Sequence, residues 1–386
     1  MVPDSKACQP ADLDELAEAR FGPLGVAEIK LLRAVIKGET AYCGPNERDG
    51  DPNNDPASAD SWGPEREIRA DLIRWLCIAG SARDRVDPRG IRVHAARITG
   101  RFDLSFVVVP FFLGILRCFF SEDLDLRLIE IPSISLIGSR FPSLNADHAI
   151  VKGSILLSGA SCMGPVQLRV ARIGGNLECE GAKFQNAAVA QVDESGMALR
   201  AEAIKVGGVV LLRNGFAAEG QVRLYGAEIG GSLECDGGKF KNPARANVKE
   251  SGTALSAECA KVGRSVLLRK GFSAEGRVQL TGAEIGAMLV CDGGEFKNPA
   301  QAGVARSGMA LYADSAKVAG GVYLCDGFAA EGAVQLAGAE IGGSLECGGG
   351  RFKNPAQAEV AESGMALYAE NARVGGAVRF RSGFAA

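Results

Sequence analysis

The chain has 386 residues, 51 glycines and a formal net charge of −3. A charge this small for the length gives no general reason to expect nucleic acid or an anionic membrane as a partner. Two histidines, His94 and His148, leave little material for metal binding or acid–base chemistry, and 11 cysteines behind a polar, acidic start predict a reducing, cytoplasmic compartment.

Residues 1–90 predict a helical region with a polar loop at 43–63, which is either a loop or disordered. The segment "GVAEIKLLRAVIKG" (25–38) has the apolar spacing of an amphipathic helix that ends at Gly38. Its predicted apolar face consists of Val26, Ile29, Leu32, Val35 and Ile36. The segment "GPEREIRADLIRWLCIAG" (63–80) predicts a second helix with Pro64 in its first turn. Two interpretations stay open: a cap for a repeat structure, or a separate docking function.

The most apolar stretch of the chain is "LSFVVVPFFLGIL" (104–116), which is bounded by Asp103 and Arg117. Its 13 residues are fewer than the roughly 20 that a membrane-spanning helix needs, and Pro110 interrupts it. Buried strands are therefore the predicted structure here.

From residue 91 to 386 the chain repeats a short pattern of apolar–x–apolar triplets separated by small residues. Upstream of the longer repeats the triplets start every 10 or 11 residues, for example at Ile134, Leu144 and Ile155. Such triplets indicate very short strands, and the glycines between them indicate tight corners. The pattern predicts a mainly β fold, a parallel β-solenoid, and it lacks the spacing of an α-solenoid.

From about residue 172 a 56-residue repeat is superimposed on the short one. "RIGG" at 172, "EIGG" at 228, "EIGA" at 284 and "EIGG" at 340 mark its copies. Coils of about 22 residues with four short faces would make each repeat two whole coils, so that equivalent residues lie on one face. Eleven or twelve such coils would form a rod of roughly 55 Å, at ~4.8 Å per coil.

Each repeat also contains about ten extra residues, which we expect to form four projecting loops in a row along one edge, roughly 10 Å apart. The loops are predicted at 184–197, 240–253, 296–309 and 352–365. The candidate interaction residues at their starts are Lys241, Asn242, Pro243, Lys297, Asn298, Pro299, Lys353, Asn354 and Pro355.

Glycine and cysteine, the two residue types most suggestive of chemistry in the repeats, are both explained by packing. The glycine-rich "EIGGSLECDGGKF" lacks the Gly-Lys-Ser/Thr ending and the following helix of a phosphate loop. Cys179, Cys235, Cys291 and Cys347 recur two predicted coils apart, near 10 Å, which exceeds the ~7 Å Cα limit for a disulfide. We expect them to pack in the core.

The repeated carboxylates and serines do not indicate a catalytic site either. Glu219, Glu228 and their equivalents occupy outward positions in near-identical coils, which is typical of solvated charge. Ser195, Ser251, Ser307 and Ser363 have no histidine in the repeats to activate them. No catalytic, cofactor-binding or metal-binding residue and no cofactor is therefore assigned, and the chain is predicted to be non-enzymatic.

The "A-x-I-x-x" and "L-x-C-x-G-G-x-F" steps over residues 91–386 resemble pentapeptide-repeat proteins and their looser relatives. This resemblance implies a right-handed β-helix. Residues 62–77 and 86–106 resemble a group of bacterial proteins of unknown function, some of which are automatically labelled membrane-associated oxidoreductase, and no residue here supports that label.

Some pentapeptide-repeat proteins mimic DNA, which needs a uniformly acidic face. The segments 172–227, 228–283 and 284–339 each hold six acidic residues, against six, nine and three basic ones. The charge balance thus changes sign along the rod, which argues against this function.

The sequence favours a scaffold that presents a repetitive surface to a protein partner, with nucleic acid and membrane contact not expected. An enzyme with a site in the irregular coils 91–170 and a nucleic-acid mimic acting on a DNA-binding enzyme stay as alternatives. The ending "SGFAA" predicts either end-to-end self-association at the C-terminal coil or a truncated chain.

Overall fold

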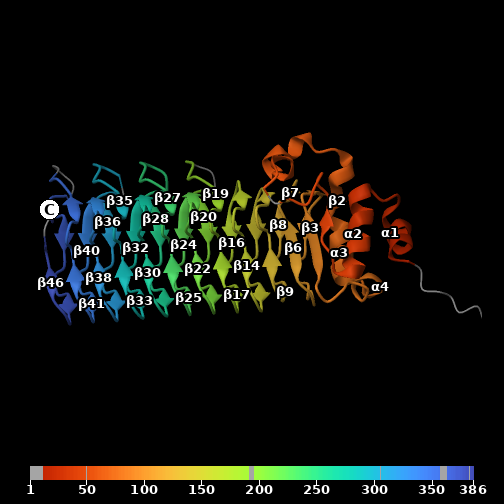
Figure 1. The fold of residues 1–386 in the computed structure, drawn as a ribbon. Helices are drawn as coiled ribbons and strands as arrows, with labels where there is room; N and C mark the ends of the chain where they lie inside the picture. Colours follow the sequence, from red (N-terminus) through yellow and green to blue (C-terminus); the bar gives the residue numbers. More distant parts are fainter. Residues whose placement is uncertain (1–11, 49, 191–194, 305, 357–362, 382) are drawn as a thin grey trace, which may run out of the picture.

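The computed structural model describes residues 12–48, 50–190, 195–304, 306–356, 363–381 and 383–386. The chain forms a rod of stacked coils with helices at its N-terminal end (Figure 1). Each complete coil contributes one short strand to each of four parallel sheets, here called A, B, C and D, that run along the rod. The predicted parallel β-solenoid with four faces is confirmed.

The strands are listed here by sheet, each in spatial order. Sheet A contains β1 (Ala41–Tyr42), β3 (Ile91–His94), β6 (Leu113–Leu116), β10 (Ile134–Ser135), β14 (Ile155–Leu156), β18 (Leu177–Glu178), β22 (Val210–Leu211), β26 (Leu233–Glu234), β30 (Val266–Leu267), β34 (Leu289–Val290), β38 (Val322–Tyr323), β42 (Leu345–Glu346) and β46 (Val378–Arg379). Sheet B contains β2 (Glu67–Arg69), β4 (Arg97–Thr99), β7 (Phe119–Phe120), β11 (Arg140–Phe141), β15 (Ser161–Cys162), β19 (Lys183–Gln185), β23 (Ala217–Glu219), β27 (Lys239–Lys241), β31 (Ser273–Glu275), β35 (Glu295–Lys297), β39 (Ala329–Glu331) and β43 (Arg351–Lys353).

Sheet C contains β5 (Phe102–Asp103), β8 (Leu124–Asp125), β12 (Leu144–Asn145), β16 (Val166–Gln167), β20 (Met197–Arg200), β24 (Gln221–Arg223), β28 (Thr253–Ser256), β32 (Arg277–Gln279), β36 (Met309–Tyr312), β40 (Ala333–Gln335) and β44 (Leu367–Tyr368). Sheet D contains β9 (Glu130–Ile131), β13 (Ile150–Val151), β17 (Arg172–Ile173), β21 (Lys205–Val206), β25 (Glu228–Ile229), β29 (Lys261–Val262), β33 (Glu284–Ile285), β37 (Lys317–Val318), β41 (Glu340–Ile341) and β45 (Arg373–Val374).

The register of sheet A gives the coil length directly. Ile134 pairs with Ile155, so this plain coil holds 21 residues. Leu177 pairs with Val210, 33 residues on, and Val210 pairs with Leu233 after another 23. Each 56-residue repeat therefore consists of one coil with a loop and one without, as predicted.

The core consists of columns of similar apolar side chains, because equivalent residues lie above one another in successive coils. Along β25, Glu228 is exposed and Ile229 is buried, which is the alternation that a strand imposes. Phenylalanines form a continuous column under sheet B, with ring centroids 5.1–5.5 Å apart from Phe184 to Phe384. Such contacts stabilise the stack beyond the burial of apolar area.

The described part of the N-terminal region contains four α-helices: α1 (Leu13–Phe21), α2 (Val26–Lys37), α3 (Ala70–Ile78) and α4 (Gly80–Arg83). Helix α2 packs on β1, β2 and β3, and α3 packs on β5. The Glu28 carboxylate is buried and accepts hydrogen bonds from Arg69 Nη2 at 2.7 Å and from the backbone N–H of Gly25 at 2.9 Å. Burial raises the pKa of Glu28, but the hydrogen bonds from Arg69 and Gly25 outweigh it and the pKa lies below its usual value.

The structure corrects three details of the helical prediction. Only residues 70–78 of the segment 63–80 form helix α3, because Glu67–Arg69 instead form β2 and pair with β4. Helix α1 was not predicted. The buried face of α2 includes Leu31, Leu32 and Val35, whereas two of the apolar residues assigned to it, Val26 and Ile36, are exposed.

The segment 43–63, predicted as a polar loop or disordered, contains two 3₁₀ helices, η1 (Pro52–Asn54) and η2 (Pro56–Ser61), and a third, η3 (Pro64–Arg66), follows it. The buried amide of Asn54 donates to the carbonyl oxygens of Asn46 and Arg48 at 3.0 and 3.1 Å. Trp62 packs nearby in a small cluster with Ala59 and Ala95. Asx turns and this cluster, rather than regular secondary structure, order the segment.

Candidate interaction surface

The four extra segments leave the rod at the same corner, between sheets B and C. The first three connect β19 to β20, β27 to β28 and β35 to β36, and the fourth follows β43. They project from one edge of the rod, in the upper part of Figure 1, while sheet D runs along the opposite edge. Parts of the loops, residues 191–194, 305 and 357–362, lie outside the described residues.

An asparagine at the start of each loop closes it. The Nδ2 group of Asn242 donates to the carbonyl oxygens of Glu250 and Thr253 at 2.7 and 2.8 Å. The Gly252 N–H in turn donates to the carbonyl oxygen of Asn242 at 3.0 Å. Asn298 makes the same side-chain contacts with Arg306 and Met309. The amide thus ties the two ends of the loop together.

A serine near the end of each loop holds the loop interior. Ser251 Oγ accepts from the Arg245 N–H at 2.9 Å and lies 2.8 Å from the Val248 carbonyl oxygen, to which it donates. Ser307 repeats the arrangement with Gln301 and Val304. Because these hydroxyls are buried and hydrogen-bonded to the backbone of their own loop, they hold the loop in one conformation.

Successive loops also contact one another, although they are 56 residues apart in the sequence. Arg245 Nη1 donates to the Ala188 carbonyl oxygen at 3.3 Å, and Arg306 Nη1 donates to the Lys249 carbonyl oxygen at 3.0 Å. The loop row (residues 184–190, 195–197, 240–253, 296–304, 306–309, 352–356 and 363–365) is therefore a connected ridge over its first three loops.

The structure divides the candidate residues into two groups. The lysines are exposed at the base of the loop row, and so are two of the prolines, whereas Pro243 is half-buried. The exposed members are Lys241, Lys297, Lys353, Pro299 and Pro355. The asparagines Asn242, Asn298 and Asn354 are buried, and they support the loops from beneath.

Sequence reasoning missed this role of the asparagines and serines. The recurrence of Asn near the start and Ser-Gly near the end of every insertion was the available signal, because both residue types favour side-chain to backbone hydrogen bonds. The arginine contacts between loops had no such signal, since Arg245 and Arg306 lie at different positions in their loops.

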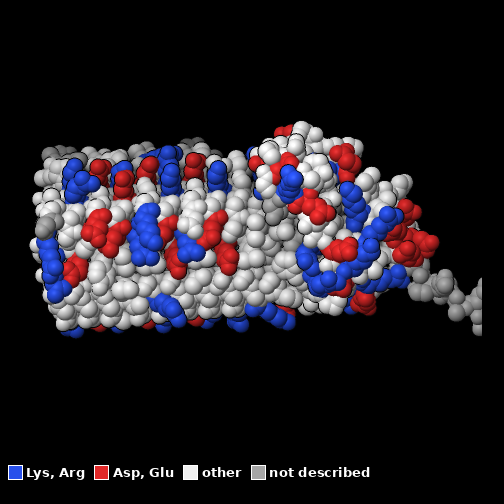
Figure 2. All heavy atoms as spheres, in the orientation of Figure 1, with Lys and Arg blue, Asp and Glu red and all other residues white. Residues whose placement is uncertain are grey.

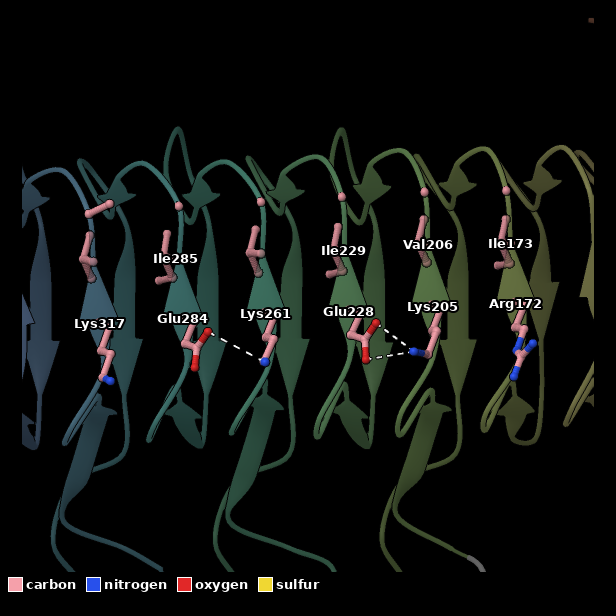
Figure 3. Close-up of a pocket in the computed structure, with 18 of the residues that line it drawn as sticks. Arg172, Ile173, Lys205, Val206, Glu228, Ile229, Lys261, Glu284, Ile285 and Lys317 are labelled. Carbon is pink, nitrogen blue, oxygen red and sulfur yellow. Dashed lines mark hydrogen bonds and ion pairs between the residues drawn. The ribbon is translucent and has the colours of Figure 1, made fainter.

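Sheet D carries the second regular surface, a shallow groove of about 1550 Å³ that extends from Ile150 to Gly375. Its charged side chains form one row with alternating sign over most of its length, and Figure 3 shows Arg172, Lys205, Glu228, Lys261, Glu284 and Lys317 in line. Lys205 Nζ lies 2.9 Å from Glu228 Oε2, and this hydrogen bond lowers the pKa of Glu228. Lys261 and Glu284 are 4.0 Å apart. Both pairs are exposed and weak.

Coil packing explains why most positions beside this row are glycine, although Ala319 occupies one of them. A Cβ atom on Gly230 would lie 2.4 Å from the carbonyl oxygen of Gly207, and one on Gly263 would lie 2.3 Å from that of Gly230. Backbone atoms cannot move out of the way as side-chain ends can. The glycine-rich motif therefore permits the close approach of successive coils.

The repeated cysteines lie in the core, as predicted. Cys179, Cys235, Cys291 and Cys347 are fully buried under sheet A, where each alternates with a leucine such as Leu212. Burial raises the pKa of the Cys347 thiol to about 12, and it also raises the pKa values of the other three thiols. Within the described part of the chain, no group of three or more His, Cys, Asp or Glu side chains could hold a metal ion.

The irregular coils have a polar hollow on sheet C. At its edge, the Asp125 carboxylate accepts hydrogen bonds from Arg127 at 2.6 Å and from Arg101 at 3.0 Å, and the hydrogen bond from Arg127 lowers its pKa. Ser143 Oγ donates to Asp123 at 2.6 Å. This is an ion-pair network of the kind that fixes neighbouring coils to each other.

Comparison of the chain with protein-family models, curated proteins and solved structures finds no match. The likeness to pentapeptide-repeat proteins stays a prediction, while the stacked parallel sheets themselves are shown. None of the helices in the described ranges has the length and hydrophobicity needed to cross a membrane.

Proposed function

We propose that this protein is a non-enzymatic scaffold that binds a macromolecular partner, a protein, through the loop row. The observation that carries the proposal is the regular placement of the loops on one edge. Two coils separate neighbouring loops, so their bases repeat about every 10 Å along the rod. A partner with a similar repeat, or one long segment, can contact several loops at once and gain affinity from each.

The contacts within the loops support this proposal. Binding costs less conformational entropy when a surface is already ordered, and the Asn242 and Ser251 contacts order the loop before any partner arrives. The exposed lysines at the loop bases give the surface three cationic groups at equal spacing, and these alternate along sheet B with three glutamates: Lys241, Lys297 and Lys353 with Glu219, Glu275 and Glu331. We expect the partner to present acidic groups to the lysines.

Affinity purification with quantitative mass spectrometry tests the proposal when two matched variants accompany the wild type. The triple variant Lys241→Glu, Lys297→Glu, Lys353→Glu reverses charge at the loop row. The control Lys205→Glu, Lys261→Glu, Lys317→Glu makes the same change, with the same 56-residue spacing, on sheet D. A protein retained by the wild type and the control but lost by the loop variant supports the proposal. Capture that is equal for all three, or no capture, contradicts it.

A further inference from the structure

The coils nearest the N-terminal helices expose a group of apolar side chains at the corner between sheets C and D. Their exposed fractions are 71% for Phe106, 63% for Val108, 47% for Leu128, 43% for Ile150 and 43% for Val170. We call these five residues the apolar corner. Single exposed apolar residues are ordinary, but a cluster of them marks a contact surface.

The backbone stacks the corner residues of successive coils, and the exposed His148 occupies the corner between Leu128 and Val170, with its N–H donating to the Arg169 carbonyl oxygen at 2.8 Å. Phe106 N–H donates to the Arg127 carbonyl oxygen at 2.9 Å, and Leu128 N–H donates to that of Asp147 at 3.0 Å, so the corner residues of successive coils are stacked. On sheet D, Ile150 pairs with both Glu130 and Arg172, and Val108 bridges to Glu130.

Three of these residues have strained backbone. Phe106, Leu128 and Val170 have φ angles of 59°, 56° and 57°, in the left-handed region that bulky residues avoid. At the same corner the repeats place mostly small or polar residues: Ala203, Gly226, Cys259, Gly282, Ser315, Gly338 and Asn371. Large apolar side chains are therefore exposed at strained backbone positions in the first coils. This pattern indicates that the side chains contact a partner.

We infer that the apolar corner is a contact between two copies of this chain, packed antiparallel with a two-fold axis through the coil of Ile150. This axis places each residue opposite the one that is equally far from Ile150 along the rod. Leu128 then faces the partner's Val170, and Ile150 faces the partner's Ile150. Glu130 faces the partner's Arg172, and the contact occurs twice by symmetry.

The same axis places Val108 opposite the partner's Lys205, which is paired with Glu228 in its own chain, and His148 opposite the partner's His148. Glu130 is 3.1 Å from Lys152 of its own chain, so the carboxylate lies between two cations in the dimer. Arg127 and Arg169, which the symmetry places opposite each other, are each bound to a carboxylate of their own chain, Asp125 and Asp147. Their mutual repulsion is therefore reduced.

The shape of the rod leaves this surface accessible. Sheet D runs along the lower edge of Figure 1, and the 3₁₀ helices of the N-terminal region rise on the opposite side, with the loops. The contact spans about five coils, or roughly 24 Å. An interface of this length lies at the small end of specific interfaces, so we expect a reversible dimer with a Kd on the order of micromolar.

Sedimentation velocity from about 1 to about 100 μM tests the inference, since a micromolar dimer forms across that range. We expect Glu130→Arg and Arg172→Glu each to raise the Kd at least about tenfold, because each change places like charges at both symmetric contacts. The double variant should restore the dimer. Within one chain the strand of Ile150 separates the two residues, so this rescue reports a contact between copies.

Two further variants complete the experiment. Ile150→Asp should abolish the dimer. Glu284→Arg repeats the charge reversal of Glu130→Arg on the same sheet but outside the contact, and it should leave the dimer intact. Thermal unfolding shows whether each variant is folded. A chain that stays monomeric, or a dimer that both single charge reversals leave unchanged, overturns the inference. So does a monomer that sediments with phosphatidylserine vesicles in an Ile150-dependent manner, since that result would assign the apolar corner to lipid.

Discussion

The coils at residues 91–170 and the coils from residue 172 onward share one backbone but differ in what they place on it. On sheet D the first group presents Val108, Glu130 and Ile150, whereas the repeats alternate lysine and glutamate. On the side shown in Figure 2, red and blue side chains alternate along the repeats, and the coils nearer the N-terminal helices are mostly white. Both groups bury the inward-facing apolar residues of their strands, but the continuous phenylalanine column runs only from Phe184 to Phe384.

This difference separates the demands of the fold from those of function. Inward positions must fill the same space in every coil, so they vary little. Outward positions vary freely, and alternating charge there also disfavours unwanted association of the long sheets. In the first coils apolar side chains replace the alternating charges, and we interpret this difference as a sign that this surface binds a partner. The following predictions test this comparison, starting from the largest expected effect.

Phe240→Ala should lower the free energy of unfolding by about 3–5 kcal/mol, because the side chain is buried between Phe216 and Phe272 at 5.3 Å. Phe141→Ala, in the first coils, should cost about 0.5–1.5 kcal/mol less, because its aromatic neighbour Phe120 is 6.3 Å away and the next strand of sheet B offers Cys162. Equilibrium denaturation followed by circular dichroism gives both values. An equal or larger cost at Phe141 would contradict the idea that the continuous column adds stability.

Gly230→Ala should cost about 1–3 kcal/mol, because the added methyl group would meet a backbone carbonyl oxygen at 2.4 Å. The chain provides a control at position 319, where alanine stands 56 residues after Gly263, in the same column of stacked coils as Gly230. Ala319→Gly should change stability by no more than about 1 kcal/mol. Thermal unfolding of the two variants decides the matter, and a neutral Gly230→Ala would show that the coils separate more easily than their geometry suggests.

Asp125→Asn should destabilise the first coils at neutral pH by about 1–3 kcal/mol, because Asp125 accepts charge-assisted hydrogen bonds from two arginines. The pKa of Asp125 lies below its ordinary value in the folded chain, so its contribution is present above the unfolded pKa, near 4, and is lost as the pH falls through the lower folded pKa. The variant should lose that acid sensitivity in a series of melting temperatures. Glu228→Gln, in an exposed pair, should have the melting temperature of the wild type at every pH. If this variant also loses acid sensitivity, the two regions do not differ in how much their carboxylates stabilise the fold.

The smallest effect is expected at the loop bases. Asn242→Ala removes two buried hydrogen bonds and should speed amide exchange within residues 240–253, with a cost of about 1 kcal/mol. Its exposed neighbour provides the control, as Lys241→Ala should alter neither exchange nor stability measurably. Slow exchange in the asparagine variant would mean that Ser251 and the contacts between loops suffice.

The architecture was predictable from two patterns in the sequence. The apolar–x–apolar triplets indicate the short strands, and the 56-residue repeat limits the possible number of residues in a coil. A 56-residue step that must return each residue to the same face leaves few choices of coil, and Ile229 and Cys235 are buried as expected. Features that depend on distant partners were not predictable. Glu67–Arg69 have the apolar spacing of a helix but join a sheet, because β4 offers them a pairing edge. Asn242 is buried because the far end of its loop returns over it.

The strands β1 and β2 have a consequence for how the chain acquires its structure. They belong to the N-terminal region, yet they are the first strands of sheets A and B, and β3 and β4 pair directly onto them. A ribosome delivers this region before any coil, so a template for pairing exists when the first coil emerges. Each finished coil then becomes the template for the next. We expect assembly to follow the order of synthesis, and a chain that lacks these two strands to begin misregistered and to aggregate while it is still being made.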